Sequence, residues 1–185
     1  MTRSKLRDFL AREAIRECLV RYCHAIDRAD ADALYALYWD DATDDHGPSY
    51  SGPARGFIEY ARSTFEQSPR NVHLLGNVLI EFVEPSIAVS EAYFSAWQTK
   101  RTLDGEENTR HALGRFCDIF QLRGGEWKIW KRRLVMDLYQ SGSRMQLADE
   151  VQFNGFVPIG APWRSDTFSE VVAEARLLST TATAL

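Results

Sequence analysis

The sequence predicts an α+β fold, in which three N-terminal helices close a strongly curved antiparallel sheet into a cone-shaped barrel. Apolar residues recur at helical spacing before residue 66, whereas from residue 72 onward the chain contains long runs rich in β-branched and aromatic residues. Helices followed by a series of strands are typical of domains in which the helices gather on one face of the sheet. A length of 185 residues fits one such domain with one core.

Three amphipathic helices are expected in the first third of the chain. The first spans residues 6–26, and its apolar face is formed by Leu6, Phe9, Leu10, Ile15, Leu19, Tyr22 and Ile26. A polar break at residues 27–30 leads into the second helix, whose apolar face is formed by Leu34, Leu37 and Tyr38. The acidic segment that follows predicts an irregular, solvated connection, in which Asp44–His46 can end a short strand. The third helix is expected between Pro53 and Pro69.

Four long strands are expected next, at residues 72–83, 87–101, 109–122 and 127–138. The short polar segments EPS, LDGEEN and RGGE between them are typical of hairpin turns, so the strands should form an antiparallel meander. Gly76 and Gly114 are isolated within strands, which predicts bulges or bends that curl the sheet around the helices. A curled sheet that is closed by helices encloses a pocket.

Charge and composition argue against several classes of protein. The net charge of −4 is small and charges of both signs are interspersed, so we expect no binding to nucleic acid or to an anionic membrane surface. No stretch approaches the ~20 apolar residues of a membrane span, and the N-terminus lacks the apolar segment of a secretory signal. A cytoplasmic protein is therefore expected. The sequence also lacks dinucleotide-binding, P-loop and serine-hydrolase motifs.

The three cysteines, Cys18, Cys23 and Cys117, are expected to be reduced and mostly buried. Their number is odd and they show no C-x-x-C spacing, so neither a disulfide framework nor a structural zinc site is expected. His46 follows four acidic residues in the segment DDATDDHG, but no spacing typical of a metal-binding motif accompanies it. We therefore expect no metal ion, and we keep His46 as a candidate for the ligand pocket.

Four features carry a resemblance to a known family: Asp27, the segment Trp39–Ala42, His73 and the hairpin Gly125–Lys128. Together with the order of elements over residues 8–140, they make the chain similar to the SnoaL-like branch of the nuclear-transport-factor-2-like superfamily. Enzymes of this type include scytalone dehydratase, hexachlorocyclohexane dehydrochlorinase and bile-acid 7α-dehydratase. The resemblance implies that a small hydrophobic substrate binds inside the cone and that no cofactor is needed.

The resemblance assigns a catalytic dyad to Asp27 and His73, with His73 as the base and Asp27 as the carboxylate that orients its ring. Tyr22, five residues before Asp27, resembles the tyrosine of the bile-acid dehydratase type and is the expected acid or oxyanion donor. Taken without the resemblance, His73 and Tyr22 can also be core residues, and Asp27 can cap a helix. Both interpretations stay open at the level of sequence.

Four further residues are candidates for binding the substrate: His46, Arg115, Tyr93 and Trp97. In the resembled family, the residue at the position of His46 often points inward. Tyr93 or Trp97 occupies the position at which scytalone dehydratase has a second strand histidine. Arg115 lies within a strand and would be costly to bury unpaired, so it either faces outward or binds an anionic or carbonyl group.

The function expected from these residues is that of a cofactor-independent, dehydratase-like lyase acting on a small aromatic, polycyclic or polyketide-type alcohol. The same residues suit a retro-aldol formaldehyde lyase or a proton-transfer isomerase, since each reaction begins with charge that the pocket must stabilise. A different class is also open, namely a non-catalytic binding or assembly module similar to the small subunit of an oxygenase. In that class the Asp/His pair would only support the structure.

Residues 142–185 are expected to form a tail that follows the barrel domain of residues 1–141. The tail is rich in Gly and Pro before it returns to a helical pattern, so it should pack on the mouth of the barrel or on a neighbouring subunit. The large aromatic residues exceed what one cone can bury around a cavity: Trp97, Trp127, Trp130, Phe153, Phe156 and Trp163. A dimer or trimer that associates through the outer face of the sheet is therefore expected.

Overall fold

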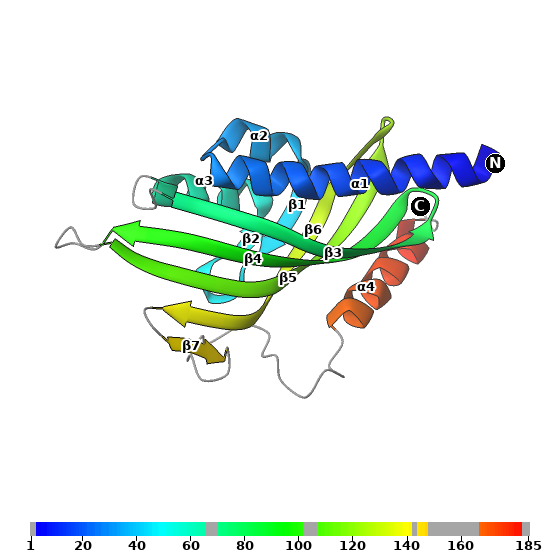
Figure 1. Cartoon of the computed structure of the whole chain (residues 1–185). Helices are drawn as coiled ribbons and strands as arrows, with labels where there is room; N and C mark the ends of the chain where they lie inside the picture. The colour runs from blue at the N-terminus through cyan, green and yellow to red at the C-terminus, as the bar shows by residue number, and fades with distance from the viewer. Residues whose placement is uncertain (1–2, 66–69, 102–106, 142–143, 148–166, 183–185) are drawn as a thin grey trace.

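The computed structural model of the chain describes residues 3–65, 70–101, 107–141, 144–147 and 167–182. Within these ranges a curved sheet carries the long helix α1 along one face, with α2 and α3 near its C-terminal end and α4 on the opposite face (Figure 1). This arrangement confirms the predicted α+β class, with N-terminal helices covering a strongly curled sheet.

The helices are α1 (Arg3–Asp27), α2 (Ala31–Ala36), α3 (Ala54–Phe65) and α4 (Thr167–Ala182), and a short 3₁₀ helix, η1, spans Gly47–Ser49. The strands are β1 (Tyr38–Asp45), β2 (Ser51–Pro53), β3 (Arg70–Glu84), β4 (Ile87–Arg101), β5 (Glu107–Arg123), β6 (Glu126–Ser141) and β7 (Arg144–Leu147). The sheet order is β2-β1-β6-β5-β4-β3 with β7 paired to β6, so the sheet does not close on itself. Strands β3 to β6 form the antiparallel meander that the hairpin signals predict.

Helix α1 packs its apolar face on the concave side of the sheet, and Ile15 and Tyr22 are almost completely buried there. The apolar residues of its first turns are largely exposed instead: Leu6, Phe9 and Leu10. Helix α2 begins after Asp30, whose Oδ1 accepts a hydrogen bond from the Ala33 N–H at 2.9 Å. The role of helix cap therefore belongs to Asp30 and not to Asp27.

The second helix is shorter than the sequence predicts, because the chain turns into strand β1 at Tyr38. Strand β1 runs parallel to β6 and pairs Thr43–Asp45 with Lys131–Arg133, so the sheet satisfies the backbone groups of this acidic segment. Ala42 and Asp44 are buried on either side of the exposed Thr43, as in a strand, and Tyr38 is buried at its start. The prediction of a helix through Tyr38 was wrong, and most of the acidic segment is a strand rather than an irregular connection. The end of β1 at Asp45 agrees with the expectation that Asp44–His46 can end a short strand, and the sheet is mixed rather than fully antiparallel.

Two glycines bend the long strands, as predicted. The register of β3 against β4 shifts between Leu75 and Val78, next to Gly76, and the register of β5 against β6 shifts at Gly114. A Cβ atom on Gly114 would lie 2.3 Å from the carbonyl oxygen of Val135. The close approach of these two strands therefore requires glycine at this position.

Helix α4 covers part of the outer face of the sheet. Its residues Val171, Val172 and Ala175 form a second apolar cluster with Ile87, Val89, Cys117, Ile119 and Val135. Trp130 packs against this cluster, whereas Trp127 packs against the main core. The tail was expected on the mouth of the barrel or on a neighbouring subunit, but its helix α4 lies on the outer face of its own sheet. Phe153, Phe156 and Trp163 lie outside the described residues.

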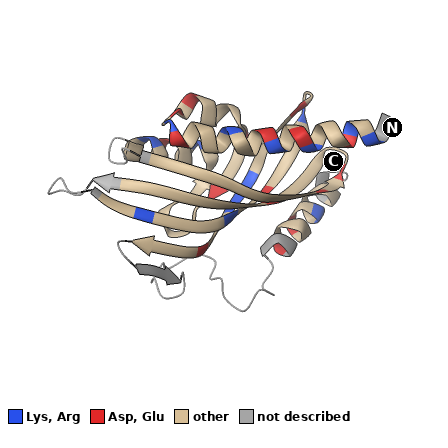
Figure 2. Cartoon of the chain, viewed as in Figure 1, with Lys and Arg blue, Asp and Glu red and all other residues tan. Residues whose placement is uncertain are grey.

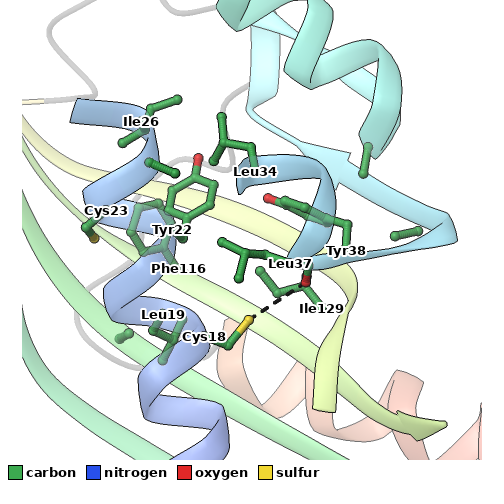
Figure 3. Close-up of a cluster of buried hydrophobic side chains, with 14 of the residues drawn as sticks. Cys18, Leu19, Tyr22, Cys23, Ile26, Leu34, Leu37, Tyr38, Phe116 and Ile129 are labelled. Carbon is green, nitrogen blue, oxygen red and sulfur yellow. Dashed lines mark hydrogen bonds between the residues drawn. The ribbon is translucent and has the colours of Figure 1, made fainter. Parts of the chain in front are cut away.

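The main core fills the space between α1 and the concave face of the sheet (Figure 3). Cys18, Cys23 and Cys117 are buried and free, as predicted. Burial raises the pKa of the Cys18 thiol to about 12 and that of the Cys23 thiol to about 11. These thiols therefore stay protonated at neutral pH and serve as core residues.

Charged residues of both signs alternate along the exposed side of α1 (Figure 2). Several of them pair within the helix, including Arg16 with Glu13 at 2.7 Å and Arg21 with Glu17 at 2.7 Å. None of the helices in the described ranges combines the length and the apolar character that crossing a membrane requires.

Candidate active site

A cavity of about 260 Å³ opens between the concave face of the sheet and helices α1 and α3. Its helical wall consists of Tyr22 and Ile26 from α1 and of Phe57, Tyr60, Ala61, Thr64 and Phe65 from α3. The volume lies just below the roughly 300–1,000 Å³ that is typical of sites for drug-sized ligands. The cavity therefore suits a small ligand of mainly apolar character.

The sheet presents its side chains to the cavity in three cross-strand rows. The first row contains Asn71, Gln98 and Arg110, the second contains His73, Ala96, Ala112 and Tyr139, and the third contains Phe94 and Met136. Leu75 and Gly114 continue the third row in the strand register but do not line the cavity. Successive rows are two residues apart along β3 and β4, which is about 6–7 Å. The rows therefore run from a polar end, past a histidine with two alanines beside it, to an apolar end.

His73 and Asp27 form a hydrogen-bonded pair at the second row. The Nδ1 atom of His73 lies 2.6 Å from Oδ1 of Asp27, and the backbone N–H of His73 donates to Oδ2 at 3.0 Å. The two side chains are only 12% and 16% exposed. Because Asp27 is the last residue of α1, both oxygens of its carboxylate join the end of this helix to strand β3. The structure thus brings together the two residues that the family resemblance pairs.

The carboxylate of Asp27 selects the tautomer of the neutral His73 ring. An ionised carboxylate only accepts hydrogen bonds, so Nδ1 carries the hydrogen and Nε2 keeps a lone pair. His73 lines the cavity, and none of the described residues forms a hydrogen bond with its Nε2. A proton taken up at Nε2 would create an imidazolium whose charge Asp27 offsets. The pair can therefore act as a base toward a ligand in the cavity.

Tyr22 borders the same cavity from α1. Its ring packs edge-to-face on Phe116, with the ring centroids 5.4 Å apart (Figure 3). Burial raises the pKa of Tyr22 above its usual value, although the positive charge of Arg132 opposes this effect. The hydroxyl therefore stays protonated and can only take part as a hydrogen-bond donor or acceptor. Core packing of the ring and a donor role of the hydroxyl are compatible.

His46 is a second histidine of the cavity wall, and a carboxylate holds this ring too. Its Nδ1 hydrogen-bonds Oδ1 of Asp44, which is fully buried and accepts the Tyr38 hydroxyl hydrogen on Oδ2 at 2.7 Å. The ring stacks on Phe57 with centroids 4.0 Å apart. In the described part of the chain, no three His, Cys, Asp or Glu side chains are grouped so that they could hold a metal ion.

Tyr93 and Trp97, which were expected to bind substrate, lie on the outer face of the sheet. Ala96 pairs with His73 and lines the cavity, so the residues next to it in β4 point to the other side. Tyr93 and Trp97 are 42% and 44% exposed, and the Trp97 ring stacks on His111 with centroids 3.8 Å apart. The predictions for these two residues were wrong, because each residue is next in the strand to one whose side chain lines the cavity.

Arg115 also lies outside the cavity, because it alternates with inward-facing residues of β5. Its guanidinium group donates to Glu91 at 3.0 Å and to both carboxylate oxygens of Asp137 at 3.1 Å. Burial by itself would lower the pKa of Arg115, but the two carboxylates raise it above its usual value. Arg115 therefore faces outward and is paired, which is the first of the two alternatives expected for it, and it does not line the cavity as a substrate-binding residue would.

Three polar residues of the first row were missed at the level of sequence: Asn71, Gln98 and Arg110. Asn71 precedes His73 by two positions, so strand alternation alone places both on one face. Gln98 and Arg110 can be placed in the cavity only when the registers of the hairpins are known. Gln98 is the cross-strand neighbour of Asn71, and Arg110 is the cross-strand neighbour of Gln98. The alternation of side chains along a strand, counted back two residues from His73, is therefore the sequence signal that identifies Asn71.

A buried ion pair lies behind the cavity wall. Arg132 and Asp118 form two hydrogen bonds, of 2.8 Å from Nε to Oδ1 and 2.7 Å from Nη2 to Oδ2, and both side chains are fully buried. The guanidinium carbon lies 4.0 Å from the ring centroid of Tyr22 and 4.3 Å from that of Phe116. The pair therefore supports two aromatic rings that border the cavity.

A family model described as a SnoaL-like domain matches residues 7–133 of the chain. A comparison with curated protein sequences finds no significant match. Solved structures, in contrast, include several with a similar fold. A scytalone dehydratase-like protein from Novosphingobium aromaticivorans DSM 12444 has a TM-score of 0.71 and 18% identity, covering 85% of this chain and 98% of its own.

Two further structures extend the comparison. A hexachlorocyclohexane dehydrochlorinase (LinA) of type 2 has a TM-score of 0.69 and 17% identity, covering 78% of this chain and 97% of its own. The beta subunit of a protein described as an aromatic-ring-hydroxylating dioxygenase, also from Novosphingobium aromaticivorans DSM 12444, has a TM-score of 0.57 and 23% identity. It covers 70% of this chain and 91% of its own. At these identities the likenesses establish the fold that the chains share.

Proposed function

Since the chain belongs to the SnoaL-like domain family, we propose that it is a cofactor-independent lyase that eliminates water from a small hydrophobic alcohol in the cavity. The observation that carries the proposal is the Asp27–His73 pair, because His73 borders a mainly apolar cavity and its Nε2 is left for a ligand. Two similar structures bear the names of a dehydratase and a dehydrochlorinase, which supports elimination chemistry on this fold.

In the proposed reaction the substrate carries an acidified C–H bond and a hydroxyl group on the adjacent carbon. Nε2 of His73 removes the proton, and the electron pair of the C–H bond forms the new C=C bond as the C–O bond breaks. The imidazolium returns the proton to the departing hydroxide, so water leaves and His73 ends neutral. Asp27 keeps the ring in one orientation and offsets its transient positive charge.

Tyr22 is the proposed donor to the oxygen on which negative charge builds during proton removal. Its hydroxyl suits this role because burial keeps it protonated. The small side chains of Ala96 and Ala112 lie in the same row as His73 and leave room for the reacting carbon. The same proton transfer without a leaving group would give an isomerase, and cleavage of a C–C bond would release formaldehyde, so the products must be identified.

The test begins with aromatic and polycyclic alcohols that raise the melting temperature of the protein, because a ligand of the folded state stabilises it. Mass spectrometry then detects the loss of water from each ligand. His73→Ala and Asp27→Asn are each expected to lower turnover by about 10²–10⁴-fold. His111→Ala is the matched control, since it removes a histidine of the same sheet from the outer face, and it should leave turnover unchanged.

Turnover at the wild-type rate in both dyad variants, on an identified substrate, would contradict the proposed roles. Asp27→Asn is informative because it keeps the shape of the side chain and removes its charge. Circular dichroism and the melting temperature of each variant separate a loss of chemistry from a loss of fold. Release of formaldehyde or formation of an isomer, with the same dependence on His73, would replace dehydration as the reaction.

A further inference from the structure

The first row of the cavity is polar, although the rest of the wall is mainly apolar. Asn71 of β3 lies opposite Gln98 of β4, and Gln98 lies opposite Arg110 of β5, so three neighbouring strands each contribute one polar side chain. All three residues line the cavity. Two amide groups and a guanidinium group are therefore concentrated at one end of the site.

Two atoms of this row are buried and lack a partner. The Nε atom of Arg110 and the Oδ1 atom of Asn71 are inaccessible to solvent, and within the described ranges nothing forms a hydrogen bond with either. Buried polar atoms without a partner are rare in folded proteins, because each costs stability. A donor and an acceptor of this kind in one row of a cavity indicate that a ligand supplies the missing partners.

Arg110 also lacks a counter-ion among the residues that the structure describes. Arg115, on the opposite face of the same strand, shows the contrast, because it is paired with Glu91 and Asp137. The carboxylate of Asp27 does not supply the missing charge, since both of its oxygens are engaged by His73. A partly buried guanidinium group without a counter-ion favours an anion, and its planar fork matches a carboxylate.

We infer that the first row binds a carboxylate of the substrate, so that the substrate class is a small apolar hydroxy acid. Arg110 receives the carboxylate, and Oδ1 of Asn71 accepts a hydrogen bond from a hydroxyl group of the ligand. This inference rests on the proposed function, because it concerns the same ligand in the same cavity. The first row lies about 6–7 Å from the row of His73, so the carboxylate is held a few bonds away from the reacting carbon.

The test uses two probes of the same shape, 3-hydroxy-3-phenylpropanoate and its uncharged primary amide, with binding measured by isothermal titration calorimetry. The wild-type protein is expected to bind the acid more tightly than the amide by about tenfold or more. Arg110→Gln should abolish this preference, and Arg110→Lys should retain part of it. Arg16→Gln makes the same change of net charge on the exposed side of α1, so it should leave the preference intact.

A wild-type protein that fails to prefer the acid, or a preference that survives in Arg110→Gln, would overturn the inference. If Arg110→Gln unfolds, Arg110→Lys carries the test, because it must lower the affinity for the acid and not for the amide. His73→Ala should keep the preference, since binding the carboxylate does not require the base. If turnover requires His73 but the wild type shows no preference for acids, only the carboxylate site is refuted. If the wild type prefers acids but turnover does not require His73, only the dyad is refuted.

Discussion

Replacing one partner of the Arg132–Asp118 pair should destabilise the protein far more than replacing both. The two side chains are fully buried and are joined by hydrogen bonds of 2.8 and 2.7 Å. Arg132→Met leaves the carboxylate of Asp118 buried without its partner, which costs about 3–5 kcal/mol. In a chain of this size each kcal/mol lowers the melting temperature by about 2–4 °C, so a decrease of about 6–20 °C is expected.

The double variant Arg132→Met/Asp118→Leu removes both charges and fills the space with apolar atoms. Its free energy of unfolding should equal that of the wild type or exceed it by about 1–4 kcal/mol. The Nη1 atom of Arg132 is already buried without a partner among the described residues, which adds to the cost of keeping the charge. Removing the guanidinium group therefore removes a cost in stability that the wild type carries.

Urea unfolding followed by circular dichroism measures these differences. Glu13→Gln is the control, because the Glu13–Arg16 pair has the same 2.7 Å separation but its side chains are 48% and 46% exposed. An exposed pair contributes about 0–1 kcal/mol, so the control should unfold close to the wild type. A double variant as unstable as the single variants, or single variants as stable as the control, would refute the reasoning.

Three other predictions follow from local geometry. Gly114→Ala should lower the free energy of unfolding, measured in urea, by about 1–3 kcal/mol or more, because the new Cβ would lie 2.3 Å from the Val135 carbonyl oxygen. An unchanged free energy of unfolding would contradict this prediction. Because burial raises the pKa of Cys18 to about 12 and of Cys23 to about 11, a thiol reagent at pH 8 should label them only after unfolding. We expect a dimer or trimer in light scattering, and Leu74→Glu, on the exposed outer face, should give the 21.1 kDa monomer; a monomeric wild type would rule the assembly out.

The long elements could be predicted from the sequence because their periodicity continues over many residues. Helix α1 and the strands β3 to β6 each carry enough repeats of one pattern for their bounds to be found within a few positions. Strand β1, at Tyr38–Asp45, could not be predicted in this way, because its parallel partner β6 lies far away in the chain. Its acidic composition is typical of a loop, and the burial of Asp44 depends on hydrogen bonds from Tyr38 and with His46 that the sequence does not reveal.

The site could be predicted in part. Asp27 and His73 are 46 residues apart, and no local pattern connects them, so the family resemblance alone paired them. Tyr93 and Trp97 were assigned to the wrong face because a shift of one residue in a strand exchanges its two faces. Arg110 was missed because it lies close to a polar turn, where a charged residue is normally solvated. Its place in the cavity depends on the register of two hairpins.

The order of the rows also determines how a ligand would lie in the proposed complex. Along β4, Gln98, Ala96 and Phe94 line the cavity at steps of two residues, and Ala96 lies opposite His73. The polar end, the row of the base and the apolar end therefore follow one another in this order. A ligand with its carboxylate at the first row places its apolar body near Phe94 and Phe116 at the other end. The reverse orientation would place the carboxylate against the rings of Phe94 and Phe116 and away from the guanidinium group of Arg110, which is costly. The carbon that meets His73 is therefore the one between the polar group and the apolar body.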